Sequence, residues 1–169
     1  MEPKKIYFDL DNVLADFDEG VRELAGFRFR DRNHRTREED DQMWDAVRKV
    51  DHFYLKLGFI PGAKDFFGEV RGRFGDRVEI LSGLPKPHRR IEYAAEDKIF
   101  WSHAWLDPEI KVNLVYKEGK ADFCLGPEYI LIDDLELNII RWRDKGGTGI
   151  LFTDTLSAAE QLNEILKES

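Results

Sequence analysis

Residues 6–11 have the sequence IYFDLD, a short apolar strand pattern that ends on two carboxylates, Asp9 and Asp11. Burying a carboxylate is costly unless it is paired, so two of them at the end of an apolar strand indicate a site. In open parallel sheets, ligands bind at the carboxyl ends of the strands. This stretch therefore predicts a buried first strand with a site at its carboxyl end.

Four later segments share this apolar, β-branched or aromatic pattern, and helical patterns separate them. The expected strands are Ile6–Leu10, Val78–Leu81, Val112–Tyr116, Tyr129–Ile132 and Gly149–Phe152. The runs YILI and GILF lack polar alternation, as strands do when crossover helices cover both faces of a sheet. We therefore expect an α/β fold with a doubly wound, five-stranded parallel sheet.

Two helices are indicated by their apolar spacing. From Pro61, the sequence PGAKDFFGEVRGRF places four apolar side chains on one face, namely Ala63, Phe67, Val70 and Phe74. The segment 157–166 starts at Ser157 and has Glu160 three residues later, which is typical of a capping box. We expect a helix to begin there and to close the domain.

The first crossover is longer than a simple one. About fifty residues separate the first strand from Pro61, whereas a whole βα unit uses about thirty. Asp16–Leu24 and Glu38–Val50 have helical patterns, with the basic segment RFRDRNHRTR between them. We expect a small helical cap over the end of the sheet, formed by residues 15–60 and inserted into a core of residues 1–14 and 61–169.

Composition excludes several classes of protein. A chain of 169 residues has the size of one domain, or of a core domain with a small insertion. A hydrophobic content of 42% excludes a chain that is disordered for lack of apolar residues. The net charge of −8 would repel a phosphate backbone, so we expect no polynucleotide partner.

The sequence also predicts a compartment. Cys124 is the sole cysteine and has no internal disulfide partner, and the first residues lack the apolar core of a secretory signal. No apolar run approaches the roughly 20 residues that span a bilayer. We expect a protein of the reducing cytoplasm, with a small-molecule ligand and no membrane partner. The oligomeric state stays open, a homodimer included.

A second acidic pair, Asp133 and Asp134, follows the strand Tyr129–Ile132 as Asp9 and Asp11 follow the first. Either pair alone is commonly a strand end or a helix cap. Two pairs at equivalent strand ends would repel one another unless a hard divalent cation lies between them, and oxygen ligands suit Mg²⁺. An EF-hand fails in DLDNVLADFDEG, because its sixth position is Leu14 instead of glycine.

The chain also resembles a known superfamily. DLDNVLADF, ILSG, a later lysine and ILIDD occur in the order of the four motifs of the haloacid dehalogenase (HAD) superfamily. More narrowly, the chain is similar to the 5'(3')-deoxyribonucleotidases through FYLKLGFIPGA, the KIFW helix, ILIDD and ILFTD. The resemblance implies a HAD-like Rossmannoid fold and a Mg²⁺-dependent phosphatase that acts on a nucleotide through an aspartyl-phosphate.

The resemblance implies a role for each motif residue. Asp9 would be the nucleophile, and Asp11 the general acid and then the general base. Ser82 and Lys120 would hold the phosphate oxygens. Lys117, in the same segment, is an alternative, but we favour Lys120 because it follows Gly119 and opens the next apolar turn.

The implied metal ligands are Asp9, Asp134 and the backbone carbonyl of Asp11, with Asp133 either sharing the Mg²⁺ ion or orienting its waters. Two positions depart from the family pattern. Asn12 replaces a glycine that the nucleotidases often have after the second Asp, and Gly83 replaces a second hydroxyl residue. The second departure removes a phosphate donor and leaves backbone N–H groups, at Gly83 for example, to bind the phosphate.

We expect residues of the cap to determine substrate specificity. Phe17, Met43 and Trp44 match positions where the nucleotidases enclose the base, and a planar ring can stack on a nucleobase; ordinary packing within the cap would also explain them. The arginines between residues 28 and 37 could attract an anionic substrate. The acidic run 38–41 follows them, so we expect a solvated loop with local ion pairs.

Three alternatives stay open at this point. The enzyme could be a HAD phosphatase for another small phosphorylated metabolite. A receiver domain shares the acidic pocket, Mg²⁺ and the lysine, but its phosphoacceptor follows a middle strand, and here a cap interrupts the first crossover. A non-catalytic module that kept the fold is the third. Turnover of a phosphate monoester separates the enzymes from both binding modules.

Overall fold

A computed structural model describes residues 1–167, the side chain of Lys117 excepted. Its five strands are all parallel, in the order β3-β2-β1-β4-β5. They are β1 (Lys5–Phe8), β2 (Val78–Gly83), β3 (Val112–Val115), β4 (Tyr129–Asp133) and β5 (Thr148–Leu151). The expected α/β fold with a five-stranded parallel sheet is confirmed, and each expected strand is present with its ends shifted by a residue or two.

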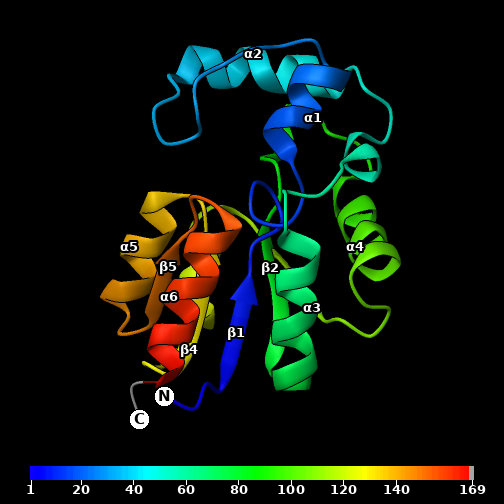
Figure 1. Ribbon diagram of the computed structural model, residues 1–169. Helices are drawn as coiled ribbons and strands as arrows, with labels where there is room; N and C mark the ends of the chain where they lie inside the picture. The colour runs from blue at the N-terminus through cyan, green and yellow to red at the C-terminus, as the bar shows by residue number, and fades with distance from the viewer. Residues whose placement is uncertain (168–169) are drawn as a thin grey trace.

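Helices cover both faces of the sheet (Figure 1). The α-helices are α1 (Phe17–Leu24), α2 (Arg37–Arg48), α3 (Ala63–Phe74), α4 (Ala94–Trp105), α5 (Glu136–Asp144) and α6 (Thr155–Lys167). Short 3-10 helices are η1 (Phe53–Lys56), η2 (Gly75–Arg77), η3 (Pro87–Arg89) and η4 (Lys117–Phe123). None of these helices is long and apolar enough to cross a membrane.

The pleat of the strands divides the core in two. Ile6 and Phe8 of β1 pack in the larger cluster with α3, α4 and α6, whereas Tyr7 packs on the opposite face with Trp142 of α5. β4 alternates in the same way, because successive side chains of a strand point to opposite faces. Both faces of β1 and β4 are therefore buried, which explains the apolar runs at residues 6–8 and 130–132.

One helix begins earlier than expected. The sequence predicted that the last helix starts at Ser157 with a capping box, but α6 starts at Thr155. The carboxylate of Asp154 accepts the N–H of Ser157 at 2.8 Å, so Asp154 is the cap and the prediction was wrong. The capping box in this chain lies instead at the start of α2, where Thr36 and Glu39 exchange hydrogen bonds.

The long first crossover forms a layer above the carboxyl end of β1, with α1 and α2 above its arrowhead in Figure 1. Two short connections join it to the sheet layer, and they are hydrogen-bonded to each other. The N–H of Asp16 donates to the carbonyl of Gly58 at 2.9 Å, and the N–H of Ile60 donates to that of Leu14 at 2.8 Å. We call residues 15–60 the cap.

Candidate active site at the carboxyl end of the sheet

The two acidic pairs meet because β1 and β4 are neighbours in register. Phe8 lies opposite Ile132, so Asp9 and Asp133 follow at the same level of the sheet. The N–H of Asp9 donates to the carbonyl of Ile132 at 3.0 Å. One carboxylate oxygen each from Asp9, Asp133 and Asp134 lies within 4.8 Å of the others. The acidic cluster expected from the sequence is therefore formed by three aspartates.

Asp9 is buried, yet one of its carboxylate oxygens accepts no hydrogen bond. Its Oδ1 accepts the N–H of Leu10 at 2.8 Å and lies 3.0 Å from Nζ of Lys120. Its Oδ2 is buried and has no hydrogen-bond partner among the described residues. Burial raises the pKa of Asp9, and the charge of Lys120 opposes that shift. A cation or a reacting group beside a buried carboxylate oxygen that accepts no hydrogen bond would stabilise it.

Asp133 has no free oxygen. Its Oδ1 accepts the N–H of Leu135 at 2.8 Å, and its Oδ2 accepts from Lys120 at 2.6 Å and from Asn138 at 3.0 Å. Burial alone would raise the pKa of Asp133, but Lys120 and then Arg32 outweigh it and lower the pKa. The geometry assigns Asp133 to holding Lys120 in place rather than to facing the centre of the site.

Asp134 pairs with a different cation, Arg32 of the cap. Burial raises its pKa well above the usual range, and Arg32 opposes the shift. Nη1 of Arg32 lies 3.4 Å from Oδ1 of Asp134 and 3.9 Å from Oδ2 of Asp9. Burial lowers the pKa of Arg32, but the carboxylates around it, Asp134 first, raise it overall. Arg32 is thus the counter-charge that the cap supplies to the cluster.

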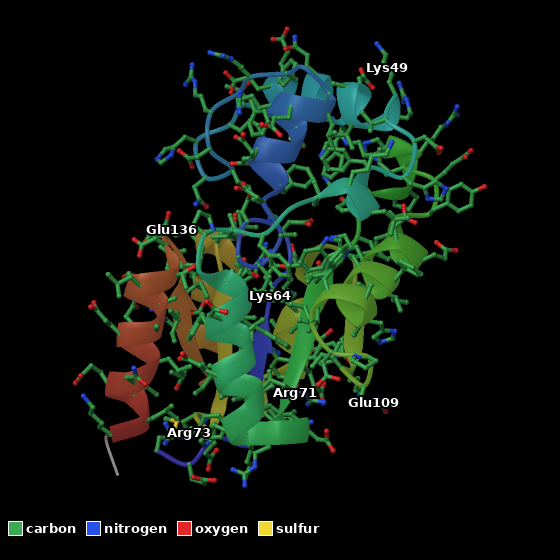
Figure 2. All side chains as sticks on the ribbon, turned by 45° about the vertical axis from the view of Figure 1, so that its right-hand side comes forward. Lys49, Lys64, Arg71, Arg73, Glu109 and Glu136 are labelled. Carbon is green, nitrogen blue, oxygen red and sulfur yellow. The ribbon has the colours of Figure 1, made fainter. Side chains whose placement is uncertain are left out.

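This position of Arg32 corrects the expectation of a solvated basic loop. Local ion pairs do form, as between Arg30 and Glu39. The loop also contacts the core: Asn33 donates to the carbonyl of Asp134 at 3.0 Å and accepts the N–H of Glu136 at 3.0 Å. Figure 2 shows Glu136 beneath the cap and Lys49 on the cap's far side.

The donor set fits a hard divalent cation. The free Oδ2 of Asp9 and the carboxylate of Asp134 are oxygen ligands beside each other, as Mg²⁺ prefers. Burial is the largest cause of the raised pKa of Asp9 and of Asp134, so a bound cation would favour their ionised forms. A metal ion would therefore be held by Asp9 and Asp134, with the carbonyl of Asp11 as the further ligand that the family resemblance implies.

Asp11 is held by a lysine that the sequence analysis did not single out. Nζ of Lys98, on α4, lies 2.8 Å from Oδ2 of Asp11, and it also donates to Oγ of Ser82 at 2.9 Å and to the carbonyl of Gly83 at 2.8 Å. Lys98 is 1% exposed, whereas Oδ1 of Asp11 is buried without a partner. Its signal was spacing: Lys98 is three residues before the buried Trp101, so it shares the buried face of the helix.

The residues expected to bind phosphate flank this network. Ser82 is fully buried and does not line the cavity described below, whereas Gly83 and Lys120 do. Burial lowers the pKa of Lys120, but Asp133 and Asp9 outweigh it and raise the pKa, so the amine stays charged. The side chain of Lys117, the alternative lysine, lies outside the described residues.

Asn12 explains the first departure from the family pattern. Its φ of +61° lies in the left-handed region, which glycine adopts freely and asparagine more readily than most residues. Its side chain also donates to Oδ1 of Asp18 at 2.9 Å and accepts the N–H of Asp18 at 3.0 Å. Asn12 therefore keeps the tight turn after Asp11 and anchors the start of α1.

A cavity of about 770 Å³ lies between the cap and the sheet, with Asp11, Gly83 and Lys120 in its lining. From the cap, Phe17 and Trp44 line it, with ring centroids 5.6 Å apart. Met43, the third residue expected there, is fully buried in the core and is absent from this lining. The buried Tyr54 also lines the cavity, and its hydroxyl has no partner among the described residues.

Comparison with known proteins shows similarity in structure. No family model matches the chain. A HAD-superfamily hydrolase from Ehrlichia chaffeensis superposes with a TM-score of 0.60 at 12% identity over 98% of both chains. A dehalogenase in an intermediate complex gives 0.56 at 13% identity, over 88% of this chain and 84% of that one. A phosphonoacetaldehyde hydrolase-like protein from Oleispira antarctica gives 0.51 at 12%, over 97% and 84%. The chain therefore has the fold of HAD-superfamily hydrolases.

Proposed function

We propose that the protein is a Mg²⁺-dependent phosphatase that hydrolyses a phosphate monoester through an aspartyl-phosphate on Asp9. The substrate that we favour is a 5'(3')-deoxyribonucleotide. One observation carries this proposal. A buried carboxylate oxygen of Asp9 accepts no hydrogen bond from any described residue, while the other oxygen of the same group contacts Lys120. That arrangement orients one oxygen for attack and places positive charge where a phosphate dianion would otherwise be repelled.

In the first half of the reaction, a carboxylate oxygen of Asp9 attacks phosphorus and the ester P–O bond breaks. The leaving oxygen takes a proton from Asp11, whose Oδ1 is unpaired and whose Oδ2 is held by Lys98. Lys120 stabilises the charge on the transferred group, and Asp133 and Asp9 keep Lys120 in place. A bound Mg²⁺ supplies charge neutralisation of the phosphate.

In the second half, Asp11 removes a proton from a water molecule, which attacks phosphorus. The bond between phosphorus and the Asp9 oxygen breaks, so inorganic phosphate leaves and the Asp9 carboxylate is restored. Lys98 holds the same Asp11 oxygen, Oδ2, in both halves. One carboxyl group therefore serves both proton transfers without a change of rotamer.

Support for a nucleotide comes from the cap. The rings of Phe17 and Trp44 both line the cavity, and aromatic stacking on a base is worth about 1–3 kcal/mol. The basic lining of the same cavity also favours the alternative, a phosphatase for another small phosphorylated metabolite, because such a metabolite can bring more than one negative group.

The test is phosphate release from a panel of deoxyribonucleotides, ribonucleotides and sugar phosphates, with and without Mg²⁺. Asp9→Asn is the test variant. Asp65→Asn, an exposed acidic residue on α3, is the matched control. We expect metal-dependent release that prefers deoxyribonucleotides, is lost in Asp9→Asn and is kept in Asp65→Asn.

A preference for sugar phosphates would retain the mechanism and reject the nucleotide. Release that Asp9→Asn leaves intact would reject the nucleophile. Trapping of one equivalent of phosphate without turnover would instead identify a phospho-accepting binding module.

A further inference from the structure

We propose that the cap wall of the cavity contains a second anion-binding site, centred on Arg35, for an acidic group of the substrate other than the phosphate that is removed. The inference rests on the proposed function for the identity of the first phosphate. It names a narrower substrate class, a phosphate monoester that carries a second phosphate or a carboxylate.

Arg35 is a buried cation with an unused donor. Its side chain is 6% exposed and lines the cavity. Its Nε donates to Oδ1 of Asp40 at 3.2 Å, and its guanidinium lies 4.5 Å from the centroid of the Phe29 ring. Its Nη1 is buried and has no hydrogen-bond partner within residues 1–167. The ion pair and the ring fix the orientation of the guanidinium in the cavity wall, and Nη1 is left without an acceptor among the described residues.

Arg35 shares its ion-pair partner with a second arginine. Asp40 is shared, because its other oxygen accepts from Arg89 at 3.2 Å. Arg89 also forms an ion pair with Asp41. Asp40 is thus divided between two arginines, and Arg35 has no other ion-pair partner among the described residues.

The cavity lining as a whole carries more positive than negative side chains. Arginine and lysine side chains outnumber aspartates in its lining, although the protein carries a net charge of −8. Arg32 and Lys120 serve the acidic cluster, but Arg37 and Lys86 line the cavity with no ion pair to any described residue. A monoester phosphate at Asp9 needs Lys120 and a metal ion. It gives Arg37 and Lys86 no partner.

A second acidic group accounts for both observations. Arginine binds phosphate and carboxylate through two parallel N–H bonds, and such charge-assisted bonds are strongest when the guanidinium is already oriented. The cavity of about 770 Å³ also has room for a substrate larger than a bare phosphate ester. The Arg35 site then holds the distal end of the substrate while Asp9 and Lys120 hold the proximal phosphate.

The experiment compares substrates that differ by one acidic group. The pairs are deoxyadenosine 5'-monophosphate with deoxyadenosine 3',5'-bisphosphate, and glycerol 3-phosphate with 3-phosphoglycerate. The test variant is Arg35→Met. The control is Arg30→Met, which removes one charge from the same loop at a side chain that is 66% exposed and absent from the cavity lining. p-Nitrophenyl phosphate, which has no second acidic group, reports the basal phosphatase.

We expect the second acidic group to raise kcat/KM in at least one pair, and Arg35→Met to lower that value by about 10- to 100-fold, the range for a charge-assisted hydrogen bond. Turnover of p-nitrophenyl phosphate stays unchanged, and Arg30→Met behaves as wild type. A gain only with the bisphosphate identifies the group as phosphate, and a gain only with 3-phosphoglycerate identifies it as carboxylate. Equal losses on all substrates, or no gain in either pair, would overturn the site.

Binding keeps the two proposals separate. In the Asp9→Asn background, calorimetry measures the Kd of the bisphosphate and of the monophosphate, with and without Arg35→Met. If no substrate is hydrolysed but the bisphosphate still binds more tightly in an Arg35-dependent manner, the anion site stands and the phosphatase is rejected. If Arg35→Met weakens binding of the monophosphate as much as binding of the bisphosphate, Arg35 contacts a neutral acceptor. The proposal of a second anion is then rejected.

Discussion

Replacing Lys98 with methionine tests whether this lysine acts through Asp11. The change keeps a long side chain and removes an ammonium that contacts Asp11, Ser82 and the carbonyl of Gly83. Breaking a buried ion pair costs about 3–5 kcal/mol. The Asp11 side chain is 16% exposed and borders the cavity, so water solvates part of the carboxylate that loses its ion-pair partner. We expect the lower end, about 3 kcal/mol, which lowers Tm by about 6–12 °C in a protein of this size.

The catalytic loss has an upper bound. General acid–base catalysis contributes about 10²- to 10⁴-fold, so an Asp11 that has lost its orientation cannot lower kcat/KM on an alkyl phosphate by more than that through this route. p-Nitrophenolate leaves without a proton, so p-nitrophenyl phosphate should still phosphorylate Asp9 quickly. Hydrolysis of the aspartyl-phosphate still needs the base, so Lys98→Met should show a rapid burst of p-nitrophenol followed by slow turnover.

Stopped-flow release of p-nitrophenol and steady-state kinetics below the lowered Tm measure both phases. Lys49→Met, on the far side of the cap (Figure 2), is the control for loss of a lysine. If Lys98 acts through Asp11, adding Lys98→Met to Asp11→Asn causes little further loss of activity. Multiplicative losses in the double variant, or a lost burst, would refute the positioning role and assign Lys98 to binding the phosphate itself.

Two further predictions concern the cap. Trp44→Ala should raise KM for nucleotides by about 5- to 100-fold, from lost stacking, and spare sugar phosphates; the neighbouring Met43→Ala should instead cost about 2–5 kcal/mol of stability and keep the substrate preference. A nucleotide effect in Met43→Ala and none in Trp44→Ala would contradict the cavity lining. The hydrogen bond from His52 to Asp97, 2.9 Å long, raises the pKa of His52 against a smaller opposing effect of burial. The stability that this hydrogen bond adds to the fold is fully present below the ordinary pKa of histidine and is lost as pH rises through the raised pKa. Tm should therefore fall over that pH range in wild type more than in His52→Gln. Parallel Tm profiles would exclude the contribution.

The fold could be predicted from the sequence because its elements are periodic and local. The runs at 6–10, 78–81, 112–116, 129–132 and 149–152 are short and mostly apolar. YILI and GILF also lack polar alternation, which in a chain of this size occurs where helices cover a parallel sheet. The acidic pairs needed one additional rule, that parallel strands present their carboxyl ends at the same edge. The start of α6 was placed wrongly because Asp154 and Ser157 are both good caps, and local sequence does not rank them.

The roles of adjacent identical residues needed the tertiary structure. Asp133 and Asp134 are equal in sequence, yet one has both oxygens committed to Lys120, Leu135 and Asn138, while the other faces the cluster. Phe17 and Trp44 were distinguished from Met43 in the same way, because a helix pattern does not say which face meets a cavity. The roles of arginines and lysines are still harder to predict from sequence, because most of these residues lie on the solvated surface.

The sequence by itself determined the parallel sheet, the extra segment after the first strand and the two acidic pairs at one edge, since these follow from periodicity and chain order. Only the tertiary structure decided that Lys98 holds Asp11, that Arg32 faces Asp9 and Asp134, and that Arg35 is buried with an unused donor. The physical reason is that a charged side chain takes its role from the charges and the burial around it. Those neighbours come from a helix and a loop that are remote in sequence from the strands they serve.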